Sequence, residues 1–490
     1  MIITQQELAH DIIETTSPKK EPEIILDFIS DWEASEQQEM MQQGVDYYNC
    51  ENDIKDRTRK HYDKDGNLVE DETAPNNRLP HGWHKILVDQ KAGYLAGNPI
   101  NFTDKEAEEN EENEEVSPNQ EFIERVNSIL DEDFNDDLQE LVRQSASKGV
   151  EWLQVYIDEE GEFNYDVIDA REVVPIWETS RQNKLESLVR YYNVEVDDEE
   201  RIRVEYWKDD VVIYYVQNDA GQLVYDDIFV DEAEQGHFVV NDQEAVWGRV
   251  PFIPFKNNRQ MKSDLNYYKE LIDSYDKNVS DRDNELEEVQ EALMVLKGYQ
   301  GADAAEAKHN LKHYKLAVVG DDGGIDSVNN EIPVEAKEKH LDRLEEDIVT
   351  FGQGVNPKQG DFGNESGVAL KHLYTLLDLK CDQTEARFKR AIKKLFWFIA
   401  EYLAIKGEGE YNPEAIQSNF DRSMLANEGE KVEMAQKSKG VISDETIASN
   451  HPWVDNPQKE LDRMNTGTVD QAGQRVRDEL EQMANSNAEL

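Results

Sequence analysis

Apolar side chains recur every three or four residues in two stretches near the N-terminus, a spacing that predicts helices. The first predicted helix spans 23–49, and the second spans about 80–96 and ends before Gly97 and Pro99. The apolar positions of the first helix are Ile24, Ile25, Phe28, Ile29 and Trp32. The N-terminal part of the chain is therefore expected to contain two helices.

From about 150 to 255 the pattern changes to short runs rich in Val, Ile, Tyr and Trp. Polar turns such as "DEEGE" and "QNDAGQ" separate these runs, which is typical of antiparallel strands. The two prolines of "GRVPFIPFKNN" (248–258) mark an edge strand or the exit from a sheet. We therefore expect an antiparallel β region here.

Helical spacing returns after the β region. It predicts a long helix over 262–297, a helix over 333–351, and between them a small α/β insert (298–332) with "YKLAVVG" as a strand and "DDGG" as a turn. A glycine-rich loop, 352–365, then leads into a very long helix over 366–405 and a polar, largely helical tail. The predicted fold class is α+β. This order of elements suits a ring subunit whose helices line a hole and whose loop projects into it.

The composition bounds the possible partners. The 490 residues are enough for two to four domains, and 107 acidic against 52 basic side chains give a formal net charge of −55. Such a surface resists charge-driven association with nucleic acid or anionic membrane, so any DNA contact must be imposed by geometry. The acidic run 104–115 is expected to be a solvated loop, because it lacks the oxygen spacing of a calcium site.

The cysteines and the apolar stretches indicate the compartment. Cys50 and Cys381 lie far apart in sequence, which argues against a disulfide framework and for a reducing environment. The N-terminus lacks the basic start and apolar core of a signal peptide. The most apolar stretch, 395–405, is about half a membrane span. We expect a soluble protein, made inside a cell, that does not contact a membrane.

The loop before the last long helix raises the question of a phosphate site. Its glycines, with the one that follows the loop, are Gly352, Gly354, Gly360, Gly363 and Gly367. A P-loop requires lysine and a hydroxyl residue after its last glycine, whereas Asp361 and Phe362 follow Gly360 here. The sequence therefore predicts neither a nucleotide site nor any other cofactor.

No other motif indicates catalysis or a metal site. His309 and His313 lie four residues apart, but a zinc site needs a third ligand that the sequence does not single out. No serine stands in a nucleophile elbow, no cysteine–histidine pair stands out, and no carboxylate pair is distinguished among the 107 acids. We therefore expect a protein without enzymatic activity, although a nuclease remains an alternative.

Five segments, in this order along the chain, resemble one known family. They are "NNRLPHGWHKILVDQKAGYLAGNPINF" (76–102), "VPFIPFKNN" (250–258), "SDLNYYKELIDSYDKNVSD" (263–281), "NELEEVQEALMVLKG" (284–298) and "SGVALK" (366–371). The chain resembles the portal proteins of long-tailed bacteriophages of Gram-positive hosts. The resemblance extends over roughly 40–405.

The resemblance implies a ring, commonly of twelve copies, at one vertex of a phage capsid. It implies that double-stranded DNA passes through the ring without sequence-specific contacts, driven inward by the large terminase. Scaffold and major capsid proteins would surround the ring, and a head-completion (connector) protein would later close it. The expected location is the virion, and the host cytoplasm during assembly. A minor head or scaffold-like capsid protein without a channel is the alternative.

The resemblance also assigns the parts of the chain. They are a wing (1–255), a helical stem (256–297 and 333–351), a small α/β clip (298–332), a channel loop (352–365), a spine helix (366–405), and a helical crown with the C-terminal tail (406–490).

The channel loop is the predicted functional site. The residues expected to face DNA are Gln353, Val355, Asn356, Lys358 and Gln359. The five glycines named above are expected to act as hinges of the loop. Lys358 is the basic side chain of the loop, and an ion pair with a carboxylate of a neighbouring subunit is an alternative role for it.

Overall fold

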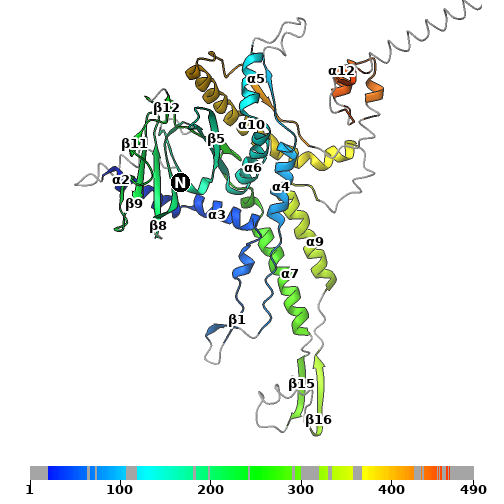
Figure 1. The fold of residues 1–490 in the computed structure, drawn as a ribbon. Helices are drawn as coiled ribbons and strands as arrows, with labels where there is room; N and C mark the ends of the chain where they lie inside the picture. The colour runs from blue at the N-terminus through cyan, green and yellow to red at the C-terminus, as the bar shows by residue number, and fades with distance from the viewer. Residues whose placement is uncertain are drawn as a thin grey trace, which may run out of the picture. The chain divides into compact units, whose positions relative to one another are not determined.

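The fold is that of a computed structural model, shown in Figure 1. It describes residues 20–62, 67–71, 74–105, 119–179, 184–196, 199–240, 243–289, 293–299, 319–328, 334–356 and 367–423, and short pieces between 432 and 463. The chain divides into two compact units, 1–356 with 376–423, and 357–375 with 424–490. The predicted acidic loop (104–115) lies almost entirely outside the described residues.

The prediction of one helix over 23–49 is wrong, because the segment folds as two helices, α2 (Glu21–Glu33) and α3 (Glu36–Tyr48). Ser35 separates them. Its hydroxyl donates to the carbonyl of Trp32 (2.6 Å) and accepts from the amide of Gln38 (3.2 Å), so it closes α2 and caps α3. The apolar positions of α2 are nevertheless buried as expected.

Two helices that the pattern analysis did not predict, α5 (Gln120–Ile129) and α6 (Glu132–Lys148), precede the sheets. Asp131 caps the start of α6 by accepting from the amide of Asp133 (3.0 Å). Gly149 ends α6 in the left-handed region, with φ of 91°. A Cβ at this position would lie 2.1 Å from the carbonyl oxygen of Met261, so only glycine fits.

Gly149→Ala is therefore expected to lower the free energy of unfolding by about 3 kcal/mol, through backbone strain together with a clash. Gly161→Ala is the matched control. Gly161 has a similar φ of 79°, but an added Cβ would meet no atom within 4 Å, so backbone strain of about 1 kcal/mol is the expected cost. Denaturant titration of the two variants measures the difference, and equal losses would contradict the clash.

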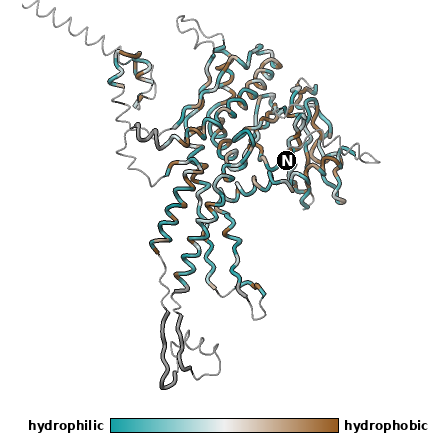
Figure 2. The backbone as a smooth tube through the Cα atoms, turned by 180° about the vertical axis from the view of Figure 1, so that it is seen from behind, coloured by the Kyte–Doolittle hydropathy of each residue, from teal (hydrophilic) through white to brown (hydrophobic). Residues whose placement is uncertain are grey.

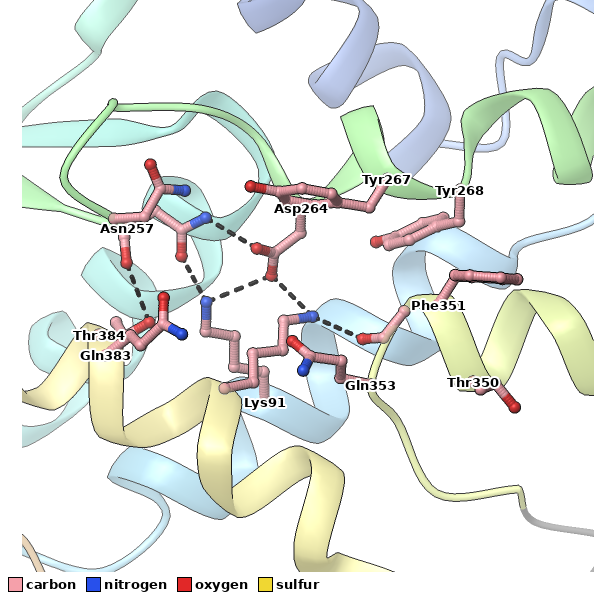
Figure 3. A pocket seen from close by; sticks show the side chains of 13 residues that line it. Lys91, Asn257, Asp264, Tyr267, Tyr268, Thr350, Phe351, Gln353, Gln383 and Thr384 are labelled. Carbon is pink, nitrogen blue, oxygen red and sulfur yellow. Dashed lines mark hydrogen bonds and ion pairs between the residues drawn. The ribbon is translucent and has the colours of Figure 1, made fainter.

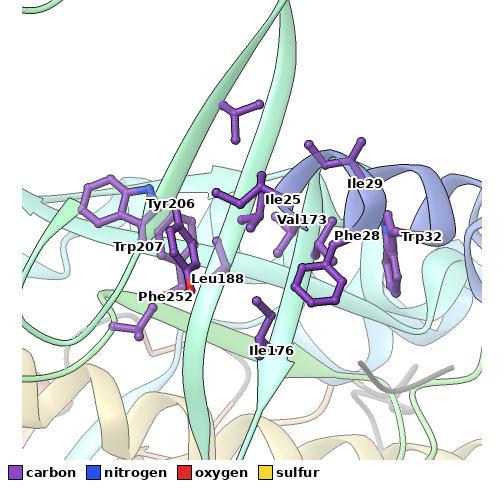
Figure 4. Close-up of a cluster of buried hydrophobic side chains, with 14 of the residues drawn as sticks. Ile25, Phe28, Ile29, Trp32, Val173, Ile176, Leu188, Tyr206, Trp207 and Phe252 are labelled. Atoms are coloured by element: carbon purple, nitrogen blue, oxygen red, sulfur yellow. The ribbon is translucent and has the colours of Figure 1, made fainter. Parts of the chain in front are cut away.

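The predicted antiparallel β region is confirmed. Its largest sheet has the strand order β10-β9-β8-β7-β6, and β11 also pairs with β9. These strands are β6 (Val173–Trp177), β7 (Leu185–Val196), β8 (Glu199–Trp207), β9 (Val212–Gln217), β10 (Leu223–Tyr225) and β11 (Glu234–Gln235). Helix α2 contributes the apolar stripe Ile25, Phe28, Ile29 and Trp32 to the core of this sheet, as Figure 4 shows. Burial of such side chains stabilises each by roughly 1.5–3 kcal/mol.

A second sheet has the order β14-β4-β5. It is formed by β4 (Val150–Ile157), β5 (Phe163–Ile168) and β14 (Phe252–Lys256), and the predicted edge is confirmed since β14, which carries Pro254, is an edge strand. The long helix α10 (Gly367–Lys406) matches the predicted 366–405 and packs on this sheet through Phe388 against Phe255, with ring centroids 5.0 Å apart.

Three further pairs of short strands are present. They are β1 (Lys60–Tyr62) with β2 (Leu68–Glu70), β3 (Asn101–Asp104) with β17 (Ile416–Asn419), and β12 (Phe238–Val240) with β13 (Gln243–Ala245). Of these, β1–β2 and β12–β13 join neighbouring segments, and β3–β17 joins segments far apart in sequence.

Two helices, α7 (Lys269–Val289) and α9 (Val334–Phe351), lie side by side, and an antiparallel ribbon of β15 (Leu293–Tyr299) and β16 (Val319–Val328) lies beyond them (Figure 1). The helix predicted over 333–351 is confirmed. The helix predicted over 262–297 is wrong at both ends, because Asp264–Tyr267 form a 3-10 turn before α7 and 293–297 pair as a strand with 324–328. The "DDGG" turn is also wrong, because 321–324 belong to β16.

An extended segment before helix α4 (Trp83–Ala96) follows the surface of α7. The amides of Asn77, Leu79 and His81 donate to side chains of α7 at positions 284, 280 and 276, at 2.7, 3.0 and 3.1 Å. Every second residue of an extended chain thus meets every fourth residue of a helix, and the three acceptors are buried. In Figure 2 much of α7 and α9 is hydrophilic, in keeping with this polar packing.

The second unit contains the short helix α12 (Asp444–Ser449), among the few tail residues that are described. Across the described part of the chain, none of the helices is both long enough and apolar enough to cross a bilayer.

Candidate functional site: the root of the glycine-rich loop

Helix α9 ends at the first residues of the predicted channel loop. The amide of Gln353 donates to the carbonyl of Thr350 (3.1 Å) and that of Gly354 to the carbonyl of Val349 (3.0 Å). With Gln353 at φ of 53°, this is a Schellman termination in which glutamine takes the left-handed position that glycine usually occupies. The chain leaves α9 in one defined direction.

Two of the predicted hinge glycines are packed tightly. A Cβ at Gly352 would lie 2.5 Å from Leu87 Cδ1, and one at Gly354 would lie 2.3 Å from Leu87 Cδ2. The glycines therefore allow the chain to pass close to helix α4. This close approach gives a reason for glycine at both positions that does not depend on movement.

Gln90 on α4 holds the next residue of the loop through two backbone hydrogen bonds. Its Nε2 donates to the carbonyl of Val355 (2.8 Å), and its Oε1 accepts from the amide of Val355 (2.9 Å). Val355 is 7% exposed, so its side chain lies inside this chain. Val355 thus anchors the loop.

Gln90→Ala removes both hydrogen bonds and is expected to speed hydrogen exchange at the Val355 amide by about tenfold or more, since a lost buried hydrogen bond costs roughly 1–3 kcal/mol. Gln42→Ala, which removes hydrogen bonds of an exposed side chain on α3, is the control. Mass-spectrometric hydrogen exchange measures both. Unchanged exchange at Val355 would show that Gln90 does not hold the loop.

Next to this anchor, two lysines share one aspartate (Figure 3). Lys380 Nζ of α10 lies 2.8 Å from Asp264 Oδ2 and donates to the carbonyl of Gly352 (2.9 Å). Lys91 Nζ of α4 lies 3.2 Å from the same Asp264 oxygen and donates to Asn257 Oδ1. Asn257 Nδ2 in turn donates to Asp264 Oδ1 (2.8 Å). The network therefore joins α4, the residues before α7, and α10 to the first residue of the loop.

All the charged groups of this network are buried, with Lys91 1%, Asp264 4% and Lys380 8% exposed. Burial alone would raise the pKa of Asp264, but the charges of Lys380 and Lys91 and the hydrogen bonds of Lys380 and Asn257 hold that pKa below its usual range. Burial lowers the pKa of Lys91, against the attraction of Asp264. Asp264 is therefore the ionised centre of the network.

Two buried titratable groups beside the network, His84 and Cys381, are neutral. Burial lowers the pKa of His84 to about 3, so its imidazole is neutral, and its Nδ1 lies 2.7 Å from the hydroxyl of Tyr268. Burial also raises the pKa of the Cys381 thiol to about 11. Neither group compensates the second lysine.

A cavity of ≈ 380 Å³ opens beside these lysines. We call it the lysine pocket, the cavity around Lys91, Asp264 and Lys380. Two aromatic side chains on its wall, Tyr267 and Phe351, are each 59% exposed. The lysine pocket thus joins a buried positive centre to an exposed apolar rim.

The structure places only part of the predicted site. Gln353 and Asn356 are half-buried, and Gly367 is the first residue of α10. Lys358, Gln359, Gly360 and Gly363 lie outside the described residues. The predicted DNA-facing and hinge roles therefore stay predictions. Within the described ranges, no group of three or more metal-ligating side chains could hold a metal ion.

The lysine network was not predicted from the sequence. One signal was present: Leu87, Lys91 and Leu95 follow at four-residue steps on the buried stripe of α4, so Lys91 occupies an apolar position of a helix. Buried lysines occur almost only where a partner neutralises them. The identity of that partner was not readable, because Asp264 lies far away in sequence.

Comparison with known proteins identifies the family. The family described as phage portal protein, SPP1 Gp6-like, matches residues 31–473. The portal protein of Bacillus phage SPP1 is 35% identical over 464 residues, covering 94% of this chain and 89% of the relative. The portal protein of Clostridium phage phiCD119 is 31% identical over 446 residues, covering 87% of this chain and 92% of the relative.

Among solved structures, the neck of a native GTA particle computed with C12 symmetry aligns with 76% of this chain and 89% of that chain. The TM-score is 0.35 and the identity 10%, which is too low to support an argument about the fold. The family match and the two relatives, each covering most of the chain, confirm the resemblance seen in the sequence. This chain belongs to the phage portal protein family.

Proposed function

We propose that copies of this chain form a closed ring, commonly twelve in this family, at one capsid vertex, and that the ring is the channel for double-stranded DNA during packaging and exit. The observation that carries the proposal is the 35% identity to a portal protein over 94% of the chain. The large terminase, scaffold and major capsid proteins and a head-completion protein are the proposed partners. The portal family is structural, and we propose no catalytic role.

The described elements support the following proposed assignment of the parts, in which the start of the clip differs from the sequence expectation. Residues 1–255 form the wing, and the side-by-side helices α7 and α9 form the stem. The clip begins with β15 at Leu293 rather than at 298, since that strand pairs with β16. The loop 352–365 forms the constriction, α10 forms the spine, and the residues beyond it form the crown.

The exposed face of α9 supports a wall along which DNA slides. Glu335, Glu338, Asp342 and Glu346 are exposed and follow at three- and four-residue steps, which places them on one face of the helix. The exposed cations of α9 pair with acids of the same helix, Lys339 with Glu335 (2.7 Å) and Arg343 with Asp347 (3.2 Å) and Glu346 (4.0 Å). The four acids outnumber these two cations, so the net charge of the face stays negative. Such a face repels phosphates, so DNA is not held along the stem.

The loop provides the close contact with DNA in this proposal. Gln353, Asn356, Lys358 and Gln359 face the duplex, whereas Val355 anchors the loop from inside the chain. Gly360, Gly363 and Gly367 are the proposed hinges, and Gly352 and Gly354 permit the close passage along α4.

Reconstituted packaging tests the function. Capsids assembled from the phage's scaffold and major capsid proteins, with and without this chain, are supplied with terminase, ATP and DNA. DNase-protected DNA is expected only in capsids that contain the chain. Equal protection without it would favour the alternative of a minor head or scaffold-like protein. Cleavage of DNA by the purified chain with magnesium would instead favour a nuclease.

A further inference from the structure

The lysine pocket carries an excess of buried positive charge. Lys91 contacts Asn257 and Asp264, and Lys380 contacts Asp264 and the carbonyl of Gly352. An ammonium group has three N–H donors, so within the described residues one donor on each lysine has no acceptor. Asp264 is the one carboxylate that contacts either lysine in the described part of the chain. With both lysines protonated, the charges of the network therefore sum to one positive unit.

Such a charge requires a counter-charge. An uncompensated ion that is removed from water is disfavoured by several kcal/mol, so either one lysine loses its proton or an anion binds beside it. The lysine pocket provides the space for an anion, ≈ 380 Å³. Its wall adds neutral polar groups from Thr350, Gln353 and Gln383, which can donate to an anion without cancelling its charge.

The rim of the pocket indicates where the anion comes from. Tyr267 and Phe351 are large apolar side chains, each 59% exposed beside a polar cavity, and such side chains are typical of protein contact surfaces. A free ion would leave both exposed, whereas a protein surface would cover them. In the proposed ring the neighbouring surface is another copy of this chain, with its 107 acidic residues.

We infer that the lysine pocket is a socket for a carboxylate, supplied by an acidic side chain of a second copy of the chain. This inference rests on the proposed ring. Lys380 also donates a hydrogen bond to the carbonyl of Gly352, so filling of the socket fixes Gly352, the first residue of the loop. An acidic side chain of one subunit thus positions the channel loop of its neighbour.

The first test uses the full-length chain as free subunits, with sodium acetate as the probe and sodium chloride at equal ionic strength as the reference. Acetate is expected to raise the Tm of free subunits, because a ligand that binds only the folded state stabilises it. The same acetate is expected to leave the Tm of assembled rings unchanged, since their sockets are filled. An absence of any acetate effect on free subunits would overturn the socket.

The second test places a carboxylate in the pocket from within the same chain. Gln383→Glu, on the wall of the pocket, is nearly isosteric and is expected to abolish the acetate effect and to weaken subunit association by about tenfold or more. Gln222→Glu, on an exposed turn outside the pocket, adds the same charge and is the matched control. Equal association of the two variants would overturn the second copy as the source of the carboxylate.

Inorganic phosphate distinguishes a free anion from a neighbouring side chain. Stabilisation of assembled rings by phosphate, lost in Gln383→Glu, would show that the socket takes a free anion in the ring, and would overturn the inferred source. The effect of acetate on the Tm of free subunits can be measured whether or not the chain assembles. A chain that binds acetate in this pocket but never forms rings would therefore contradict the proposed function and the inferred source while retaining the carboxylate site.

Discussion

Asp264→Asn is expected to lower the free energy of unfolding of the free subunit by about 3–5 kcal/mol, the cost of removing one partner from a buried ion pair. The substitution leaves Lys91 and Lys380, 1% and 8% exposed, without a carboxylate between them. Asparagine keeps the size of the side chain, so the decrease in the free energy of unfolding is due to the lost charge rather than to altered packing. Urea denaturation followed by circular dichroism measures it.

Asp219→Asn is the control for this prediction. Asp219 pairs with Arg201 at 2.6 Å but is 84% exposed, so its removal is expected to cost at most about 1 kcal/mol. If Asp264→Asn costs no more than this control, the two lysines do not require Asp264, and the network does not stabilise the chain.

The pH dependence of the same pair has a defined direction. Since the folded-state pKa of Asp264 lies below its unfolded value of about 3.9, its contribution is present above that value and is lost as the pH falls toward the folded-state pKa. The difference in stability between wild type and Asp264→Asn is therefore expected to be constant from pH 5 to 7 and to shrink below about pH 4. A difference that grew on acidification would contradict the assignment of Asp264 as ionised.

Lys358→Glu is expected to reduce DNase-protected DNA in reconstituted capsids by about tenfold or more. The substitution changes the charge of each copy from +1 to −1, a change of about two units, at the proposed constriction. The new carboxylate and a DNA phosphate at contact distance repel each other by roughly 1 kcal/mol or more. Ring formation and the Tm of the chain are expected to stay unchanged. Lys358→Arg keeps the charge and is expected to package normally.

Lys184→Glu is the matched control for charge. Lys184 is 69% exposed and lies next to β7. Its substitution by glutamate changes the net charge by the same amount at a site away from the loop. Equal packaging by Lys358→Glu and Lys184→Glu would show that Lys358 does not meet DNA. Loss of rings in Lys358→Glu alone would favour the ion pair between subunits.

Local sequence signals were sufficient for much of the fold. The three- and four-residue spacing of apolar positions located α4, α9 and α10, and short runs rich in Val, Ile, Tyr and Trp between polar turns located the sheets. Two features that were not predicted, the break between α2 and α3 and the helix α6, also had local signals. Ser35 with Gln38 follows the capping pattern that starts a helix, and Asp131 and Gly149 bracket α6 with a cap at each end.

Other features depend on contacts between distant residues. Leu293 and Leu296 lie three apart, which suited a helix, and only the pairing with β16 (Val319–Val328) makes the segment a strand. The lysine network joins residues from α4, η3 (Asp264–Tyr267) and α10 that lie more than 100 positions apart. Its geometry follows from the tertiary fold and could not be read from spacing.

The proposed channel requires that the chain close into a ring, and imaging tests this most directly. Mass photometry with electron microscopy of the purified full-length chain is expected to show closed rings with an axial hole, at about 680 kDa for twelve copies of the 56.6 kDa chain. A chain that stays at 56.6 kDa, or that forms open filaments, under conditions in which capsids package DNA would contradict the channel.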